Sequence, residues 1–411
     1  MSTQDLPDLW ERMAAFDPAT ATTEHTDDGL DDLLAAARQH CPAVRAHSGQ
    51  HGEYVLVTSD ALAREVGRDH TRFSARSGIG ASNAAGIGNQ SDPNCAPLFG
   101  QDPHLSSGDP LVDQVELRRR LQPLFTPRAS RSWRVYAATL ARMRARELVG
   151  RGQCEAVREL AHWIPAYIAG ALLGVPRRDR PRYRTLATRF FADDASECDH
   201  AALYRYLREV LALRRDQPGQ DAVSIVLAAG ASEQQALEFA VLFSAAGTLT
   251  SGDSLATLLH WLACDHELQQ QMRSHPDRLP ALVDEAARLR GAVATSGRTV
   301  TSPTRLGDLE LAAGEQVLVC WYAAGADPAR HPEANQIRLD RRPRDHSGWG
   351  AGAHRCLGQH IAQTTIASIL GATLEILPAF AVDPAVSAPR RTFGQLSGLD
   401  QLPLIWAPPA D

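Results

Sequence analysis

The segment that most constrains this chain is residues 349–358, which read Trp-Gly-Ala-Gly-Ala-His-Arg-Cys-Leu-Gly. Gly350 and Gly352 free the backbone to fold closely around whatever Cys356 contacts, and Gly358 leaves room beside the next helical turn. Apolar residues then recur at helical spacing, at Ile361, Ile366, Ile369 and Leu370. Cys356 is therefore expected at a helix N-terminus, where the dipole and free N–H groups favour a thiolate that can bind iron.

These ten residues resemble the cysteine-ligand loop of the cytochromes P450, whose pattern is Phe-x-x-Gly-x-x-x-Cys-x-Gly, often with His two positions before the Cys. Every glycine of the pattern is in register, and His354 occupies the histidine position. Trp349 replaces the usual Phe and still offers a ring that can pack under a porphyrin. The alternative is a structural cysteine in a Gly-rich turn, and motifs elsewhere in the chain have to decide between the two.

Composition and charge favour an enzyme over a nucleic-acid-binding protein. The 411 residues are 44% hydrophobic and 22% charged, which is enough for an extensive core. The net charge is -6 and no basic stripe is present, so nucleic acid is not expected as a partner. All 42 basic residues are arginine, which is typical of a GC-rich genome of the actinobacterial type.

Cysteine usage and the N-terminal sequence indicate the compartment. The seven cysteines have no paired spacing, which predicts neither a disulfide framework nor a zinc site. The first ten residues have no apolar core. The longest candidate membrane span, Phe239–Gly252, contains no charge but is too short for a bilayer. We therefore expect a cytoplasmic protein with no membrane partner. We also expect it to act as a monomer.

Hydrophobic periodicity predicts a chain that is mostly helical after a mixed N-terminal part. A strand at 54–57 and a short helix at 61–66 precede an irregular stretch, 77–112, whose length is typical of a functional or disordered loop. Further helices are expected at 134–149, 155–174, 178–192, 200–215 and 232–264, and strands at 309–311 and 316–320.

Two more motifs precede the cysteine loop. Glu285-Ala-Ala-Arg288 has both charges on one helix face, and read alone it is an exposed pair worth only about 0.2–0.5 kcal/mol. Ala246-Gly-x-x-Thr250 is small and hydroxylated in the middle of a long helix, for which close packing at Gly247 is the alternative. The order and spacing are those of the P450 family, and the resemblance covers residues 114–406. The chain is identified by this combination as a member of that family.

The resemblance implies haem b as the cofactor, with Cys356 as the axial thiolate ligand of its iron. It also implies that Arg118, Arg298 and His354 hold the haem propionates, since arginine suits carboxylate recognition. Gln114 then stands where the family has a histidine. Arg118 belongs to a run of three arginines, for which a solvated charge run is the alternative. Residues of the loop that should surround the haem are Trp349, Gly350, Gly352 and Gly358.

The same resemblance gives Glu285 and Arg288 a structural role, locking the core beneath the loop. Here the sequence departs from the family, because the usual Asn-Arg-Asp reads Gly325-Ala326-Asp327. We therefore expect the third polar contact to this pair to be weakened.

A second departure affects proton delivery. The acid that precedes the family's threonine in the long helix is Leu249, and an apolar side chain cannot relay a proton. Thr250 must then work with water, with the substrate or with another acid. Asp253, one turn along the same face, is the nearest candidate, and a solvated or capping Asp is the alternative reading.

The expected fold is therefore the mainly helical P450 fold with a small β region, in one domain over 1–411. The β-rich portions should be 54–58, 298–320 and 391–406, and the helical body 114–290 and 356–377. The resemblance places the substrate pocket between the 77–112 loop and a set of mostly small residues, Ala245, Ala246, Thr248, Val293, Ala294, Thr295, Leu396 and Ser397. Small walls favour a roomy pocket and a bulky natural-product intermediate as substrate.

The implied function is oxidation of a small molecule by a haem-thiolate monooxygenase that uses dioxygen. Electrons should come from a ferredoxin and a ferredoxin reductase, because no flavin domain is fused. The rival reaction is oxidative aromatic coupling or cross-linking of a peptide or cyclodipeptide, in which no oxygen is inserted. A different class again is a non-catalytic haem-binding protein, which gives no reason to keep Thr250 and a roomy pocket.

Overall fold

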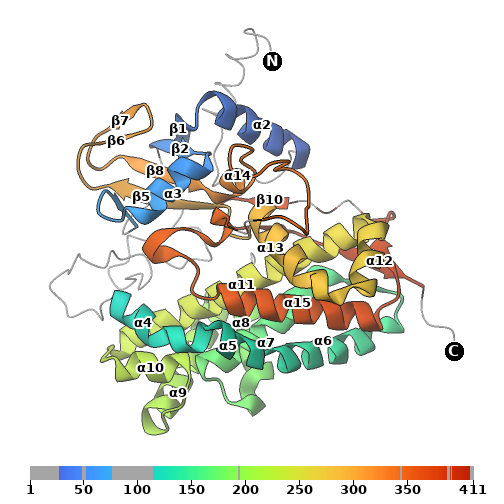
Figure 1. Cartoon of the computed structure of the whole chain (residues 1–411). Helices are drawn as coiled ribbons and strands as arrows, with labels where there is room; N and C mark the ends of the chain where they lie inside the picture. Colours follow the sequence, from blue (N-terminus) through green and yellow to red (C-terminus); the bar gives the residue numbers. More distant parts are fainter. Residues whose placement is uncertain are drawn as a thin grey trace.

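The computed structural model describes residues 27–48, 52–75, 114–192, 195–342, 345–386, 389 and 391–407. The expected loop at 77–112 and the first ten residues lie outside this part of the chain. The described residues form a β-rich part that carries the N-terminal helix and a larger helical part, drawn above and below each other in Figure 1.

The helical part is built around one long helix, α11 (Glu233–Cys264), which begins with a capping box between Ser232 and Gln235. Gly247 lets it approach α7 closely, because a Cβ at this position would lie 3.1 Å from the Cβ of Ala169. The helices around α11 are α4 (Gln114–Phe125), α5 (Pro127–Ser132), α6 (Arg134–Val149), α7 (Trp163–Leu173), α8 (Arg180–Phe190), α9 (Glu197–Asp216), α10 (Ala222–Ala228), α12 (His266–Ser274), α13 (Leu279–Leu289) and α15 (Gln359–Ile376).

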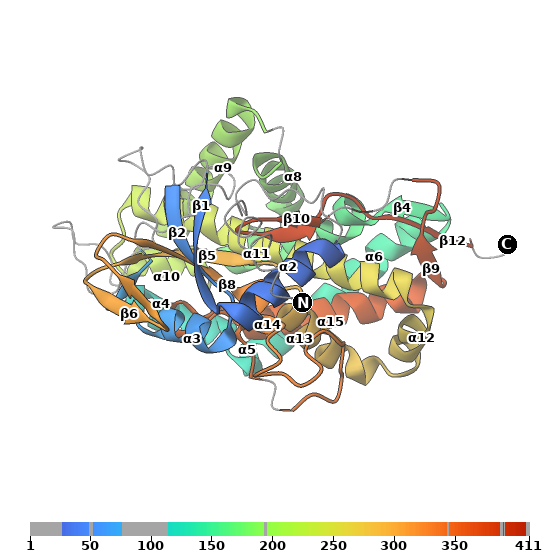
Figure 2. The same cartoon turned by 90° about the horizontal axis from the view of Figure 1, so that it is seen from above.

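The helices of this part cover one another in layers. The helix that follows the cysteine loop, α15, runs beside α6 (Figure 1). In the view from above, α8 and α9 rise at one edge, on the side away from α12 (Figure 2). The buried apolar side chains of these helices form one continuous core that includes Leu121, Leu160, Phe239 and Leu370. Among the described residues, no helix is long and apolar enough to cross a bilayer.

A five-stranded sheet forms the β-rich part, in the order β1-β2-β8-β5-β3. Only β2 and β8 run parallel, with Val55 opposite Val317, and the other neighbours are antiparallel. Its strands are β1 (Ala43–Ser48), β2 (Gly52–Val57), β3 (Phe73–Ser74), β5 (Thr295–Val300) and β8 (Gln316–Cys320). The helices α2 (Asp27–His40), α3 (Asp60–Arg68) and α14 (Trp321–Gly325) pack on it, and β6 (Thr304–Leu306) pairs with β7 (Leu309–Leu311).

The expected mainly helical fold with a small β region is confirmed, with two local corrections. Residues 155–174 were expected as one helix but start with β4 (Gln153–Glu155) and a π-helical turn, Val157–Ala161, ahead of α7. The cause is long-range pairing, because Cys154 of β4 lies opposite Leu404 of β12. The C-terminal β region likewise divides between two sheets: β10 (Arg391–Phe393) pairs with β11 (Ser397–Leu399), while β12 (Pro403–Trp406) joins β4 and β9 (Phe380–Val382).

Candidate functional site

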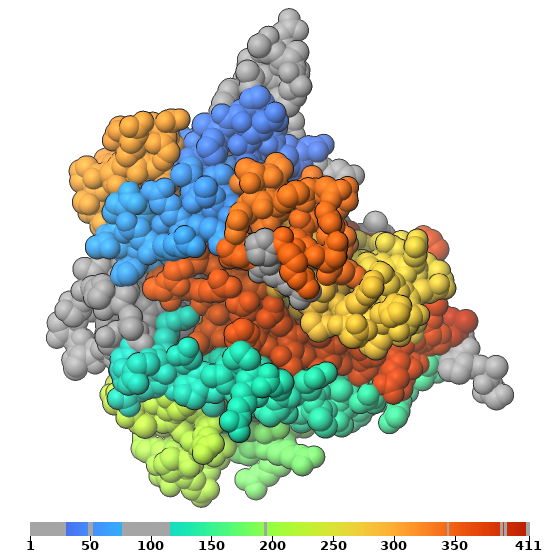
Figure 3. All heavy atoms as spheres, viewed as in Figure 1, coloured from blue at the N-terminus to red at the C-terminus, as the bar shows by residue number. Residues whose placement is uncertain are grey.

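The cysteine loop lies at the junction of the two parts. In the space-filling view, the segment running from near residue 350 into α15 forms a red-orange band between the blue β-rich part and the teal helices (Figure 3). The amide N–H of Cys356 donates to the carbonyl oxygen of Trp349 at 2.8 Å, which closes the loop on itself. Gly350 and Gly352 have φ angles of 75° and 67°, in the left-handed region that glycine tolerates.

Close approach to the neighbouring helix makes one of these glycines indispensable. A Cβ at Gly352 would lie 2.1 Å from the carbonyl oxygen of Gly67, at the end of α3. The loop is thus pressed against backbone that cannot give way. The glycine pattern noticed in the sequence has its physical reason here.

The thiol of Cys356 has competing influences on its charge. Residue Cys356 keeps accessible surface, yet its sulfur is set deep in the protein, and this desolvation raises the pKa of the thiol. The N–H groups of Gly358 and Gln359, and the positive charge of Arg118, act in the opposite direction. A bound metal ion would favour the thiolate further, so this sulfur is suited to an iron ligand.

The arginine run on α4 divides between two faces. Arg118 is half-buried, and its Nη2 donates to the carbonyl oxygen of Arg355 at 2.5 Å, which brings it to the cysteine loop. Arg119 and Arg120 are exposed and pair with Glu116 at 2.7 Å. The solvated reading thus holds for two of the three arginines. Gln114 begins α4, and the position of its side chain is outside the described set.

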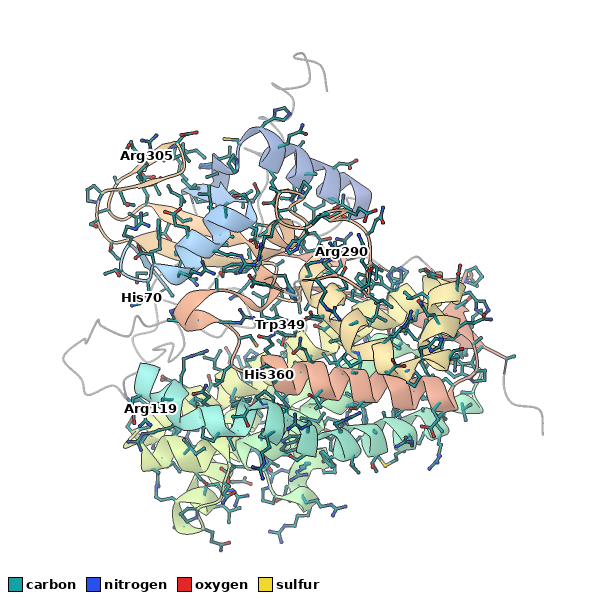
Figure 4. All side chains as sticks on the ribbon, viewed as in Figure 1. His70, Arg119, Arg290, Arg305, Trp349 and His360 are labelled. Carbon is teal, nitrogen blue, oxygen red and sulfur yellow. The ribbon has the colours of Figure 1, made fainter. Side chains whose placement is uncertain are left out.

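Other residues expected near the haem come from both sides of the loop. Arg298 lies on β5, is only 6% exposed, and donates through Nη1 to the carbonyl oxygen of Gly297 at 2.6 Å. His354 lies half-buried in the 3-10 turn Gly352–His354. Trp349 projects between the β-rich and helical parts (Figure 4).

The donor set fits a haem with a thiolate ligand. Trp349 Nε1 is a buried donor with no hydrogen-bond partner in the described part of the chain. Buried donors are normally paired, so this one indicates an acceptor that is supplied by a bound group and not by the protein. Cys356 offers one soft ligand atom, and the guanidinium groups of Arg118 and Arg298 match carboxylates. No group of three or more acidic, histidine or cysteine side chains among the described residues could hold a separate metal ion.

The middle of α11 separates the predicted pocket residues. Ala246 is exposed although it lies at the centre of a core helix, and Thr250 is half-buried one turn later. The Thr250 hydroxyl donates to the carbonyl oxygen of Ala246 at 2.7 Å, so its lone pairs remain available to accept hydrogen bonds. Ala245 is 8% exposed and lies at the edge of this face.

Thr248 points the other way, against α8. It is 2% exposed, and its hydroxyl lies with that of Ser244 near the phenol of Tyr183. Burial raises the pKa of Tyr183 to about 12, against the opposing effect of these hydroxyls. Helical geometry explains the difference, because Thr248 is two positions from both Ala246 and Thr250, and residues two positions apart on a helix do not share a face. The expected place of Thr248 in the pocket wall therefore does not match its position.

The acid considered for proton delivery is not solvated. Asp253 is 9% exposed, and its Oδ1 lies 3.0 Å from Nε2 of His162, just ahead of α7. The solvated or capping alternative is thereby excluded for Asp253. Leu249 is half-buried and supplies no proton donor.

The remaining expected pocket walls form a small backbone-linked unit. Val293 and Leu396 face each other in an isolated antiparallel bridge, and both keep some exposed surface. Ala294, Thr295 and Ser397 are buried, so they support this wall from behind. The structure thus brings the segments 293–295 and 396–397 together, as the resemblance implied.

Beneath the loop, Glu285 and Arg288 form a buried pair with relative exposures of 5% and 1%. Nη2 of Arg288 lies 2.8 Å from Oε2 of Glu285, and Nη1 of Arg288 donates to the carbonyl oxygen of Gly325 at 2.7 Å. Burial alone would raise the pKa of Glu285, but hydrogen bonds from Arg288 and the backbone N–H of Arg338 hold this pKa below its ordinary value. The exposed reading of the pair is therefore wrong.

The expected weakening of the third contact is also wrong, because sequence reasoning missed Arg341. Its Nε lies 3.0 Å from Glu285 Oε1, and its other nitrogens donate to backbone carbonyl oxygens. Asp327 serves a different purpose, accepting from the backbone N–H of Asp60 at 2.9 Å. In the sequence, Arg341 is one arginine among many and lies 56 positions from Glu285, so nothing local marks it as a partner.

A second polar lock that the sequence did not reveal ties the loop to two helices. His346 Nδ1 accepts from the N–H of Gly348 at 3.2 Å, while Nε2 lies 3.2 Å from Asp284 Oδ1 on α13. Gln363 of α15 donates to the same carboxylate oxygen at 2.7 Å. This arrangement gives His346 a proton on Nε2 and fixes the start of the loop.

Comparison with known proteins adds to this geometry. A family model described as "Cytochrome P450" matches residues 200–403. The "Mycinamicin IV hydroxylase/epoxidase" of Micromonospora griseorubida is 30% identical over 316 residues, covering 74% of this chain and 79% of that protein. "Cytochrome P450 165B3" of Amycolatopsis orientalis is 27% identical over 417 residues, covering 99% and 100%. A solved variant of the mixed-function P450 MycG with mycinamicin V has a TM-score of 0.78 at 27% identity, covering 91% of this chain and 95% of that one.

Proposed function

We propose a function from the premise that this chain belongs to the cytochrome P450 family. It oxidises a bulky natural-product intermediate, with electrons from a ferredoxin and its reductase. The general activity, which the named relatives support, is that of a haem-thiolate monooxygenase acting on a small molecule. The observation that carries the proposal is the Cys356 thiol, set deep in its loop beside the half-buried cation of Arg118.

The haem supplies the oxidising chemistry, and electron donation from a cysteine thiolate favours cleavage of the oxygen–oxygen bond. Around it, we assign Cys356 to the iron and Arg118, Arg298 and His354 to the propionates. Trp349 and the loop glycines would pack against the bound haem. We assign the buried group of Glu285, Arg288 and Arg341 the structural role of supporting the core beneath this loop.

Small walls support the proposal of a bulky substrate. Ala246 and Thr250 on α11 and the bridged pair Val293 and Leu396 all keep exposed surface, and no charged side chain belongs to this set. Apolar pockets of this kind recognise a ligand mainly by shape and buried area. The name of one relative states hydroxylation or epoxidation of mycinamicin IV, and a neighbour was solved with mycinamicin V, which supports a substrate of comparable kind.

Reconstitution with NADPH, ferredoxin and ferredoxin reductase tests the proposal. A library of natural-product intermediates is first screened for binding through the shift of the haem absorbance, and binders are then turned over. We expect NADPH consumption and a product that has gained one oxygen atom. A product that has lost two hydrogens would identify oxidative coupling instead, and a bound ligand without any NADPH consumption would indicate a non-catalytic haem protein.

Haem retention tests the two arginines. Alanine at Arg118 or Arg298 should weaken haem binding, since each removes a charge-assisted hydrogen bond worth about 1.5–3 kcal/mol. The ratio of haem to protein absorbance after gel filtration in high salt measures the effect. Arg119→Ala is the matched control, because that side chain is exposed and pairs with Glu116. Full haem occupancy in both test variants would refute the assignment.

Proton delivery is proposed to depend on Thr250 with water or substrate, since Asp253 is already engaged by His162. Thr250→Ala should lower the product formed per NADPH consumed, because the variant lacks the hydroxyl that takes part in proton transfer. Asp253→Asn should leave this ratio unchanged. A loss of coupling together with a larger solvent isotope effect in Asp253→Asn would make Asp253 the acid. If neither variant changes the product formed per NADPH consumed, peroxide-driven chemistry would be favoured.

A further inference from the structure

A histidine–aspartate pair lies where α11 meets β11 and the π-helical turn ahead of α7. His162 Nε2 lies 3.0 Å from Asp253 Oδ1, and the two side chains are 21% and 12% exposed. The amide of His162 donates to the carbonyl oxygen of Val157 at 2.9 Å, which closes the last π-helical turn ahead of α7. Such turns are rare and frequently mark functional sites. The pair is therefore built into an unusual piece of backbone.

Two glycines make room for this pair, one on each side. A Cβ at Gly252, on α11, would lie 2.7 Å from the ring of His162. A Cβ at Gly398, on β11, would lie 2.5 Å from Oδ1 of Asp253. Any side chain at either position would push the pair apart or push β11 away. The carboxylate thus sets the distance between α11 and β11.

The same β segment is held on its other side by backbone bonds. The N–H of Ser397 donates to the carbonyl oxygen of Ala292 at 2.8 Å, and the N–H of Ala294 donates to that of Gln395 at 2.9 Å. Leu396, which faces Val293, lies between these bonds. One edge of the pocket wall is therefore fixed by the 292–295 segment, and the other edge meets Asp253.

We propose that His162 and Asp253 are positioning residues that determine substrate specificity by holding β11, and with it Leu396, at a fixed distance from α11. This inference rests on the proposed function, because it concerns the wall of that same pocket. Asp253 does not have to touch the substrate or the haem. Its carboxylate lies against the backbone of Gly398, and His162 holds the carboxylate there through the contact between Nε2 and Oδ1. Without the carboxylate, only the backbone bonds to the 292–295 segment and the pairing with β10 would hold this wall.

Two iron-binding azoles measure the effect. Imidazole needs only access to the haem iron, whereas 4-phenylimidazole also has to fit its phenyl ring between the pocket walls. In Asp253→Ala and in His162→Phe, the dissociation constant of 4-phenylimidazole should change by about tenfold or more, while that of imidazole stays unchanged. Asp253→Asn keeps the shape and an acceptor for His162, so its affinities should stay near those of the unaltered protein.

Hydrogen exchange of the 394–399 amides gives a readout independent of the haem. Exchange should be faster in Asp253→Ala and in His162→Phe, and unchanged in Asp253→Asn. Gly398→Ala should also disturb 4-phenylimidazole binding, because its methyl group meets Oδ1. Combining Gly398→Ala with Asp253→Ala should reduce this disturbance, since the methyl group then occupies the space of the carboxylate.

The possible results separate the two proposals. If the unaltered protein binds no imidazole at its iron, the haem assignment itself fails. If imidazole binds, and His162→Phe and Asp253→Ala both keep unaltered 4-phenylimidazole affinity and unaltered exchange, the positioning role is wrong. If Asp253→Ala does not fold, His162→Phe alone decides. The proposal would also be overturned if His162→Phe and Asp253→Ala formed less product per NADPH consumed while their affinities for both azoles stayed constant.

Discussion

Replacing Arg288 with Met should lower the free energy of unfolding by about 3–5 kcal/mol, the usual consequence of removing one partner from a buried ion pair. Arg288 is 1% exposed, and it satisfies Glu285 together with the carbonyl oxygens of Gly325, Ala334 and Gln336. The variant leaves the buried carboxylate of Glu285 with Arg341 as its cation and the backbone N–H of Arg338 as a donor, and it removes a donor from three carbonyl oxygens. The urea midpoint of the haem-loaded protein should fall, and haem should be lost in the same transition.

Two further variants make this result specific. Arg119→Met removes an arginine of the same size from an exposed pair with Glu116 and should leave the urea midpoint almost unchanged. Arg288→Lys keeps the charge but loses the planar fork of donors, so it should resemble Met more than the unaltered protein. A midpoint of Arg288→Met equal to that of Arg119→Met would show that the buried lock does not stabilise the fold.

Gly352→Ala should abolish haem binding while leaving most of the helical part folded. Its Cβ would lie 2.1 Å from the carbonyl oxygen of Gly67 and 2.7 Å from the Cα of Arg68, so the loop has to move away from α3. The left-handed φ of 67° adds about 1–2 kcal/mol of strain for any side chain. Displacement of the loop moves Cys356. Haem content measured by absorbance should therefore drop sharply, while far-ultraviolet circular dichroism changes little.

The control for backbone strain is Gly314→Ala. Gly314 has a φ of 89°, but a Cβ there would meet nothing within 4 Å. This variant should pay only the strain, of about 1–2 kcal/mol, and keep its haem. Equal haem content in Gly352→Ala and Gly314→Ala would show that the contact with α3 does not hold the loop.

The sequence could predict the cysteine loop because its information is local. Glycines, one cysteine and the following helical periodicity lie within one short segment, so backbone rules apply directly. The same holds for the long helix expected at 232–264, which the structure has at Glu233–Cys264. Ala246 and Thr250 are four positions apart and lie on one face of α11, as helical spacing requires.

Contacts between distant segments could not be read in this way. Arg341 reaches Glu285 from 56 residues away, and His162 reaches Asp253 from 91 residues away. Nothing in the neighbouring sequence of either residue indicates its partner, since each partner is chosen by the packing of separate elements. The position of Thr248 was misjudged for a related reason: motif alignment names a segment, but helix rotation decides which side chain faces the pocket.

The absorbance of the reduced protein with carbon monoxide tests the central claim, that Cys356 holds a haem iron as a thiolate, most directly. The haem-loaded protein should show the long-wavelength band from which the family takes its name. Cys356→Ser should lose this band, while Cys320→Ser, which alters a fully buried cysteine of β8, should keep it. Survival of the band in Cys356→Ser, or its loss in Cys320→Ser alone, would contradict the account.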